Sequence, residues 1–108
     1  MINAEQLANL LGALERARDQ GAIMVCGGQR LTDPAHGRGY YLAPTLIENV
    51  EPGGELSVTE LFGPIANLYR VPDFAAALAM ANDSPYGLTA CIHTRSLHFL
   101  GPGVEVRL

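Results

Sequence analysis

The chain has 108 residues, of which 48% are hydrophobic and 17% are charged, and its formal net charge is −4. Disordered segments combine low hydrophobicity with high net charge, so this composition indicates one folded domain. Acidic residues outnumber basic ones by 11 to 7. A nucleic-acid partner is therefore not expected, because its surface needs a basic patch, and no Lys/Arg cluster offers a membrane contact.

The sequence predicts neither a targeting segment nor a disulfide framework. No apolar run approaches the ~18 residues of a membrane span, and the opening residues MINAE lack the basic and apolar parts of a secretory signal. Cys26 and Cys91 are too few for a disulfide framework. Both stand in apolar runs, where a buried, reduced thiol is the expectation. We therefore expect a cytoplasmic protein.

The first predicted element is a helix that feeds a strand. Asn3 is a capping residue, Gln6 stands three positions later as in a capping box, and Gly21 supplies the positive-φ stop. The apolar face of this helix comprises Leu7, Leu10, Leu11 and Leu14. Residues 22–26 (AIMVC) then predict a short buried strand. A helix joined to a strand through one glycine is typical of an α/β fold.

The later elements are predicted from helix-breaking, turn-forming and helix-capping residues. We expect a polar loop over residues 29–39, an extended segment over 40–50 with an edge or a bend at Pro44, and a turn over 51–54. Further strands are predicted over 65–71 and 88–94. Between them, Asp73 caps a second helix whose inward face comprises Phe74, Ala77, Leu78 and Ala81.

Three segments stand out as motifs: Thr59–Pro64 (TELFGP), Asn82–Thr89 (NDSPYGLT) and Gly39–Thr45 (GYYLAPT). Together, and in their order along the chain, they resemble the later part of the catalytic domain of NAD(P)-dependent aldehyde dehydrogenases, over roughly residues 3–98. The resemblance implies an α/β fragment of that domain, with helices packed on a mostly parallel sheet.

The end of the chain departs from the family. Residues 1–98 are accordingly expected to be a partial catalytic domain, and residues 99–108 a divergent tail. Gly101-Pro102-Gly103 stops the helix that the family continues there, since Gly costs ~1 and Pro ~3 kcal/mol inside a helix.

The first of these motifs carries the candidate site. An ionised carboxylate at Glu60 has two acceptor oxygens, enough for both hydroxyls of a ribose diol, and Phe62 offers a flat apolar face. The resemblance implies that these two residues bind NAD or NADP through its nicotinamide ribose and ring. Thr59 departs from the family, which more often has a second acidic residue there. The alternative is a loop carboxylate next to a core phenylalanine.

No catalytic residue is expected in this chain. A nucleophilic thiol needs an exposed, electropositive setting, whereas Cys26 and Cys91 lie among apolar residues, so both are interpreted as structural. The resemblance implies that the family's cysteine nucleophile lies upstream of Met1. Cys91 and His93 share one strand face, yet a closed zinc site needs four ligands and no second pair exists, so no metal is expected.

The resemblance implies an oxidoreductase that oxidises an aldehyde or semialdehyde to the acid with NAD or NADP. The segments at 61–71 and 89–94 are most similar to 2-oxoglutarate semialdehyde dehydrogenases. The expected partner is a small-molecule aldehyde, and the full-length parent is expected to be a homo-oligomer. The isolated chain is expected to be inactive for lack of the nucleophile. The alternative is a non-catalytic α/β scaffold or subunit-interaction module.

Overall fold

The first helix begins where the sequence predicts. In the computed structural model, which describes residues 3–97 and 103–106, α1 spans Ala4–Asp19. Asn3 Oδ1 accepts a hydrogen bond of 2.8 Å from the N–H of Gln6, and the chain leaves the helix through Gly21, whose φ is +99°. The predicted apolar face is confirmed, because it holds Leu7, Leu10 and Leu14 in the core.

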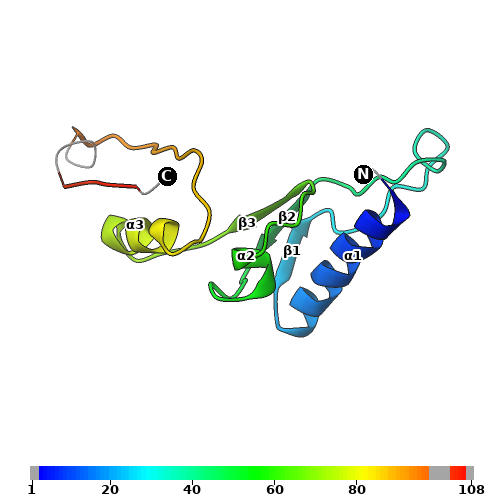
Figure 1. Cartoon of the computed structure of the whole chain (residues 1–108), viewed down its shortest axis with the longest axis horizontal. Helices are drawn as coiled ribbons and strands as arrows, with labels where there is room; N and C mark the ends of the chain where they lie inside the picture. The colour runs from blue at the N-terminus through cyan, green and yellow to red at the C-terminus, as the bar shows by residue number, and fades with distance from the viewer. Residues whose placement is uncertain (1–2, 98–102, 107–108) are drawn as a thin grey trace. The chain divides into compact units, whose positions relative to one another are not determined.

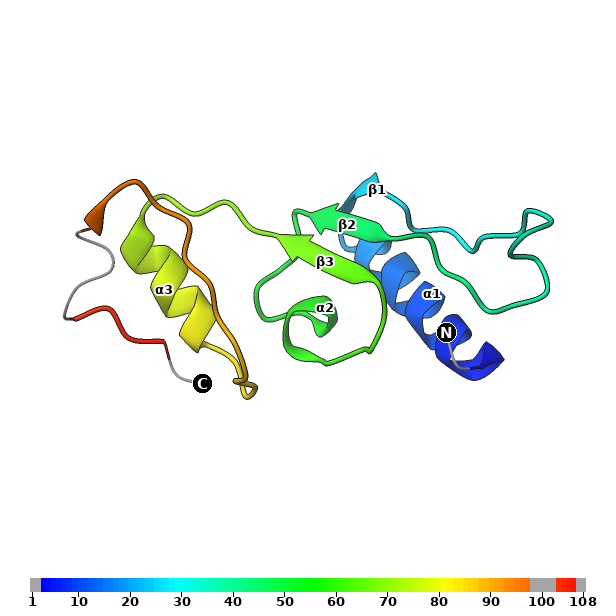
Figure 2. The ribbon, with the colours of Figure 1, turned by 90° about the horizontal axis from the view of Figure 1, so that it is seen from above.

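A three-stranded sheet packs against α1 (Figures 1 and 2). Its strands are β1 (Ile23–Cys26), β2 (Thr45–Glu48) and β3 (Ile65–Leu68), in that spatial order. β1 pairs antiparallel with β2, and β2 pairs parallel with β3. The predicted α/β class is confirmed, although the sheet expected to be mostly parallel is a mixed one within the described residues. Ile47, on the central strand, is fully buried against α1.

The prediction that residues 22–26 form a buried strand is wrong about burial. Ile23 and Val25 are 52% and 51% exposed, and Cys26 is exposed too. β1 is an edge strand, and alternate side chains of a strand point to opposite faces. Met24 packs on the core that α1 covers, so Ile23 and Val25 lie on the face opposite α1.

The interruption at Pro44 does not mark an edge strand. β2 is the central strand and begins directly after Pro44, so the missing N–H of proline falls just outside the ladder. The predicted loop over 29–39 lies between β1 and β2 and is closed by hydrogen bonds such as that from Leu31 N–H to Tyr41 O, at 2.9 Å.

A one-turn helix, α2 (Glu55–Val58), was not predicted from the sequence. It follows the expected turn over 51–54 and buries Leu56 against α1. Its first residue, Glu55, forms a two-pronged ion pair with Arg16 of α1, at 2.7 and 2.9 Å. The loop Thr59–Pro64 then joins α2 to β3, so both ends of the first motif are fixed by regular elements.

The chain divides into two units, Met1–Tyr69 and Arg70–Leu108. The second contains α3 (Phe74–Asn82), capped as predicted by Asp73, whose Oδ1 accepts from Ala76 N–H at 2.8 Å. The predicted inward face is only partly buried, with Ala81 exposed. Among the described residues, no helix is both long and apolar enough to cross a membrane.

The strand predicted over 88–94 is wrong. These residues have no regular structure, because a strand needs a hydrogen-bonding neighbour and the three described strands all belong to the first unit. Of the predicted tail, residues 99–102 and 107–108 lie outside the described residues. Within 103–106, Glu105 O accepts a hydrogen bond of 2.9 Å from Asn82 Nδ2. The proposed domain boundary at 98/99 stays a prediction.

Candidate functional site

Glu60 and Phe62 lie on the loop between α2 and β3, and both side chains are exposed. Phe62 is 75% exposed, so the alternative of a core phenylalanine does not hold in the described structure. Within the part of the chain that the structure describes, the Glu60 carboxylate has no hydrogen bond or ion pair. An accessible carboxylate with free acceptor sites therefore stands two residues from an accessible aromatic ring.

Phe62 has an unusual backbone conformation. Its φ is +53°, in the left-handed region, which costs a non-glycine residue about 1–3 kcal/mol. Such a conformation persists only where the surroundings over-determine it. The surroundings here include Gln6 of α1, whose Nε2 lies 2.5 Å from Leu61 O and 3.1 Å from Phe62 O.

The exit of the loop is fixed as well. Pro64 O accepts a hydrogen bond of 2.8 Å from Thr45 N–H on β2, and Gly63 O accepts one of 2.8 Å from Ile65 N–H. Gly63 lies so close to α1 that a Cβ built there would be 2.5 Å from a methyl carbon of Leu10. The loop is therefore attached to α1 on one side and to β2 on the other.

A hollow of about 290 Å³ lies beside this loop. It is lined mostly by the loop itself, with Leu56, Ile65 and Asn67 contributing from α2 and β3. Asn67 Nδ2 donates to Leu56 O at 2.7 Å, whereas Asn67 Oδ1 is buried without a hydrogen-bond partner among the described residues. An unpaired buried acceptor costs about 1–3 kcal/mol, so a donor on a bound molecule at that point would be stabilised.

These features fit the nicotinamide riboside part of a dinucleotide. The carboxylate can accept from two neighbouring hydroxyls, and the exposed ring can lie against a planar ring. Among the described residues, no Lys or Arg lines the hollow, so its walls offer a phosphate no charge-assisted hydrogen bond. The arrangement can hold a diol and a planar ring side by side.

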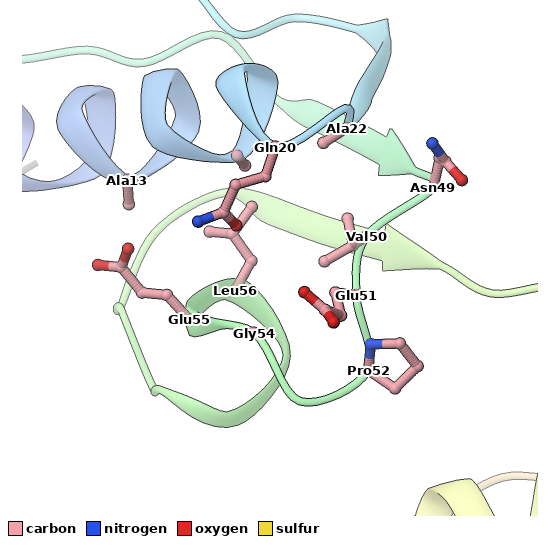
Figure 3. Close-up of a pocket in the computed structure, with 11 residues that line it drawn as sticks. Ala13, Gln20, Ala22, Asn49, Val50, Glu51, Pro52, Gly54, Glu55 and Leu56 are labelled. Carbon is pink, nitrogen blue, oxygen red and sulfur yellow. The ribbon is translucent and has the colours of Figure 1, made fainter.

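A larger hollow, of about 450 Å³, lies between the end of α1, the residues after β2 and α2 (Figure 3). Its ionisable side chains are Glu51 and Glu55, and the second of these is already paired with Arg16. The remaining uncompensated charge is that of Glu51, which repels an anionic nucleotide, so this hollow is a poorer candidate for the cofactor.

The cysteines are free, but the expectation that they are buried is wrong. Cys26 and Cys91 are both exposed, the first on an edge strand and the second in a segment without regular structure. Cys91 Sγ lies 3.1 Å from His93 Nε2, beside a groove of about 400 Å³ in the second unit. Among the described residues, no group of three or more His, Cys, Asp or Glu could hold a metal ion.

Sequence reasoning missed the role of Gln6. The spacing from Asn3 suggested a capping box, but the Gln6 amide donates to the candidate loop, 55 and 56 residues along the chain. A local pattern cannot indicate so distant a partner.

Comparison with known proteins agrees with the fold. The model of the aldehyde dehydrogenase family matches residues 1–100. The chain belongs to the aldehyde dehydrogenase family. Among curated relatives, it is 35% identical over 92 residues to an alpha-ketoglutaric semialdehyde dehydrogenase of Bacillus subtilis, covering 85% of this chain and 19% of the relative. It is 32% identical over 99 residues to a 3,6-anhydro-alpha-L-galactose dehydrogenase of Vibrio, covering 92% and 21%.

Solved structures of the family superpose on most of this chain. A 1-pyrroline-5-carboxylate dehydrogenase from Thermus with bound NAD matches with a TM-score of 0.81 and 39% identity, over 93% of this chain and 18% of that one. A 3,6-anhydro-L-galactose dehydrogenase in complex with NADP matches with a TM-score of 0.83 and 35% identity, over 91% and 20%. The chain thus spans about a fifth of the length of its aldehyde dehydrogenase relatives.

Proposed function

We propose that this aldehyde dehydrogenase chain contributes the nicotinamide-ribose clamp of an oxidoreductase that converts an aldehyde or semialdehyde to the acid. The observation that carries the proposal is the exposed pair of Glu60 and Phe62 on a loop attached at both ends. Glu60 accepts from the two ribose hydroxyls, and the Phe62 ring lies against the nicotinamide. NAD or NADP, when bound, supplies the hydride acceptor of the reaction.

The substrate class follows from the relatives. One matched relative is named for a ketoglutaric semialdehyde, and a structural neighbour from Escherichia coli, 35% identical, is a lactaldehyde dehydrogenase. A small-molecule aldehyde or semialdehyde is therefore the proposed substrate of the full enzyme, in which we also propose homo-oligomeric assembly and a cytoplasmic location. The choice between NAD and NADP is not part of the proposal.

The described site contains a binding group and no nucleophile. We propose that neither Cys26 nor Cys91 attacks the aldehyde, so the isolated chain binds nucleotide weakly and does not turn over. The test is an oxidation assay of the purified chain with a semialdehyde and NAD or NADP, followed by absorbance of the reduced cofactor. Turnover that disappears on Cys26→Ser or Cys91→Ser would overturn this part of the proposal.

The clamp is tested by binding. Nicotinamide mononucleotide, which carries the ribose diol, is titrated into the isotope-labelled chain and followed by NMR. We expect a dissociation constant in the millimolar range, on the order of −4 kcal/mol. Glu60→Gln keeps the side-chain shape but loses the charge, and we expect binding about tenfold weaker, or ~1.4 kcal/mol.

The controls isolate the diol and the charge. Glu15→Gln makes the same charge change on the exposed side of α1 and should leave the titration unchanged. Free nicotinamide lacks the ribose, so its weaker binding should not depend on Glu60. If the mononucleotide binds the Glu60→Gln variant as well as the wild type, the loop does not clamp the ribose. If neither the wild type nor any variant binds the nucleotide, the alternative of a non-catalytic scaffold is favoured.

A further inference from the structure

The side chain of Gln6 joins the first turn of α1 to the candidate loop. Its Nε2 lies within hydrogen-bond distance of two consecutive carbonyl oxygens, Leu61 O at 2.5 Å and Phe62 O at 3.1 Å. A primary amide has two N–H donors on one nitrogen, so a single side chain can serve both carbonyls. The two carbonyls belong to the peptide units before and after the Cα of Phe62, the residue whose φ is left-handed.

The position of Gln6 explains why it can do this. It is the third residue of α1, and its own N–H is already satisfied by Asn3 Oδ1. Its side chain is half-buried and directs its amide to the two loop carbonyls. The helix is in turn fixed by Leu7 and Leu10 in the core, so the amide is presented from a rigid element.

We propose that Gln6 is a positioning residue for the nucleotide clamp: its amide holds the Leu61 and Phe62 carbonyls toward α1 and so keeps Glu60 and the Phe62 ring turned outward. The inference rests on the proposed function of that loop. Without the amide, the left-handed conformation of Phe62 loses the two bonds that flank it. The loop is then free to relax, and the carboxylate and ring no longer have a fixed separation.

The test uses Gln6→Glu, because this change removes the hydrogen bonds to the loop without weakening the start of the helix. Glutamate has the same length and is favoured at the third position of a helix, where it suits the capping box and the helix dipole. An ionised carboxylate, however, has no proton to donate to either carbonyl. Asn9→Asp is the matched control, since it also converts an amide to a carboxylate on α1, at an exposed position.

The readouts are the carbonyl carbon shifts of Leu61 and Phe62, hydrogen exchange at the Ile65 amide, and binding of nicotinamide mononucleotide. For Gln6→Glu we expect both carbonyl shifts to move, the Ile65 amide to exchange roughly tenfold faster and the mononucleotide to bind several-fold more weakly. Far-UV circular dichroism should be unchanged. Protonating the introduced carboxyl at low pH restores one donor, so the carbonyl shifts should return toward those of the wild type at the same pH.

The outcomes separate this inference from the proposed function. Carbonyl shifts and exchange that match those of Asn9→Asp would overturn the positioning role. Changed shifts and exchange with unchanged mononucleotide binding would also overturn it, because the loop conformation would then not matter for the ligand. If even the wild type binds no mononucleotide, the proposed clamp fails, whereas the attachment of the loop by Gln6 is still decided by the carbonyl shifts.

Discussion

Gly63→Ala tests how tightly the candidate loop packs on α1. The φ of Gly63 lies outside the left-handed region, so an alanine there meets a neighbour and not a forbidden backbone angle. The added Cβ would lie 2.5 and 3.0 Å from the two methyl carbons of Leu10 and 3.4 Å from its Cγ. Carbon atoms prefer a separation of about 3.5–4.0 Å, so the nearest contact is about 1 Å too short.

The magnitude follows from the burial of Leu10. Its side chain is 0% exposed and surrounded by core residues, so it cannot swing into solvent to relieve the contact. Overpacking a closed core costs about 1–3 kcal/mol. For a unit of this size, each kcal/mol lowers the melting temperature by roughly 4–8 °C. We therefore expect Gly63→Ala to be measurably less stable than the wild type.

The assay is urea unfolding followed by far-UV circular dichroism, with Gly53→Ala as the control. A Cβ at Gly53 has nothing within 4 Å, so that variant should be neutral or more stable by about 0.4–1 kcal/mol. In a Leu10→Ala background, which itself costs about 2–5 kcal/mol, the room left by the leucine should remove most of the cost of Gly63→Ala. Equal stability of Gly63→Ala and Gly53→Ala would refute the reasoning, as would a full additive cost in the double variant.

Two further perturbations address the sheet and the ion pair of α2. Thr45 is buried, and its hydroxyl accepts from Gly28 N–H at 2.8 Å and donates to Ala43 O at 2.7 Å. Thr45→Val should therefore lower the free energy of unfolding in urea by about 1–3 kcal/mol. Thr45→Ser, which keeps the hydroxyl, should cost less. The hydrogen bond and charge of Arg16 lower the pKa of Glu55 below its usual 4.5, so the pair stabilises the fold above that pH and this contribution is lost as the pH falls through the lower folded value. Urea midpoints measured between about pH 6 and pH 3 should therefore fall less steeply for Glu55→Gln than for the wild type, and parallel curves would show that the pair contributes nothing.

The sequence predicted correctly those features that depend on residues close together in the chain. The caps at Asn3 and Asp73 and the leucine face of α1 depend on residues within a few positions of one another, and all are confirmed. Burial of β1 was predicted wrongly because an apolar run reads the same in an edge strand and in a buried one. The predicted strand over 88–94 failed for a related reason, since strand formation depends on a neighbour that a linear pattern does not show.

The candidate site shows the same division. Glu60 and Phe62 were found through a motif of six residues, and the structure places both at the surface of a fixed loop. The attachment by Gln6 and the contact of Gly63 with Leu10 were not foreseen, because each joins segments more than fifty residues apart. Such contacts depend on how α1 crosses the sheet, which no spacing in the sequence reports.

The span between Gln6 and Leu61 also has a consequence for how the site forms. Bringing together residues 55 apart costs more loop entropy than closing a turn of about ten residues, by roughly 1.5 kcal/mol. Contacts of such separation tend to form after local helices, and they slow folding. We therefore expect the loop to become ordered after α1 has docked, and so only once most of the first unit has been synthesised. A change that only delays docking of α1 would therefore also delay formation of the surface of Glu60 and Phe62, although neither residue is altered.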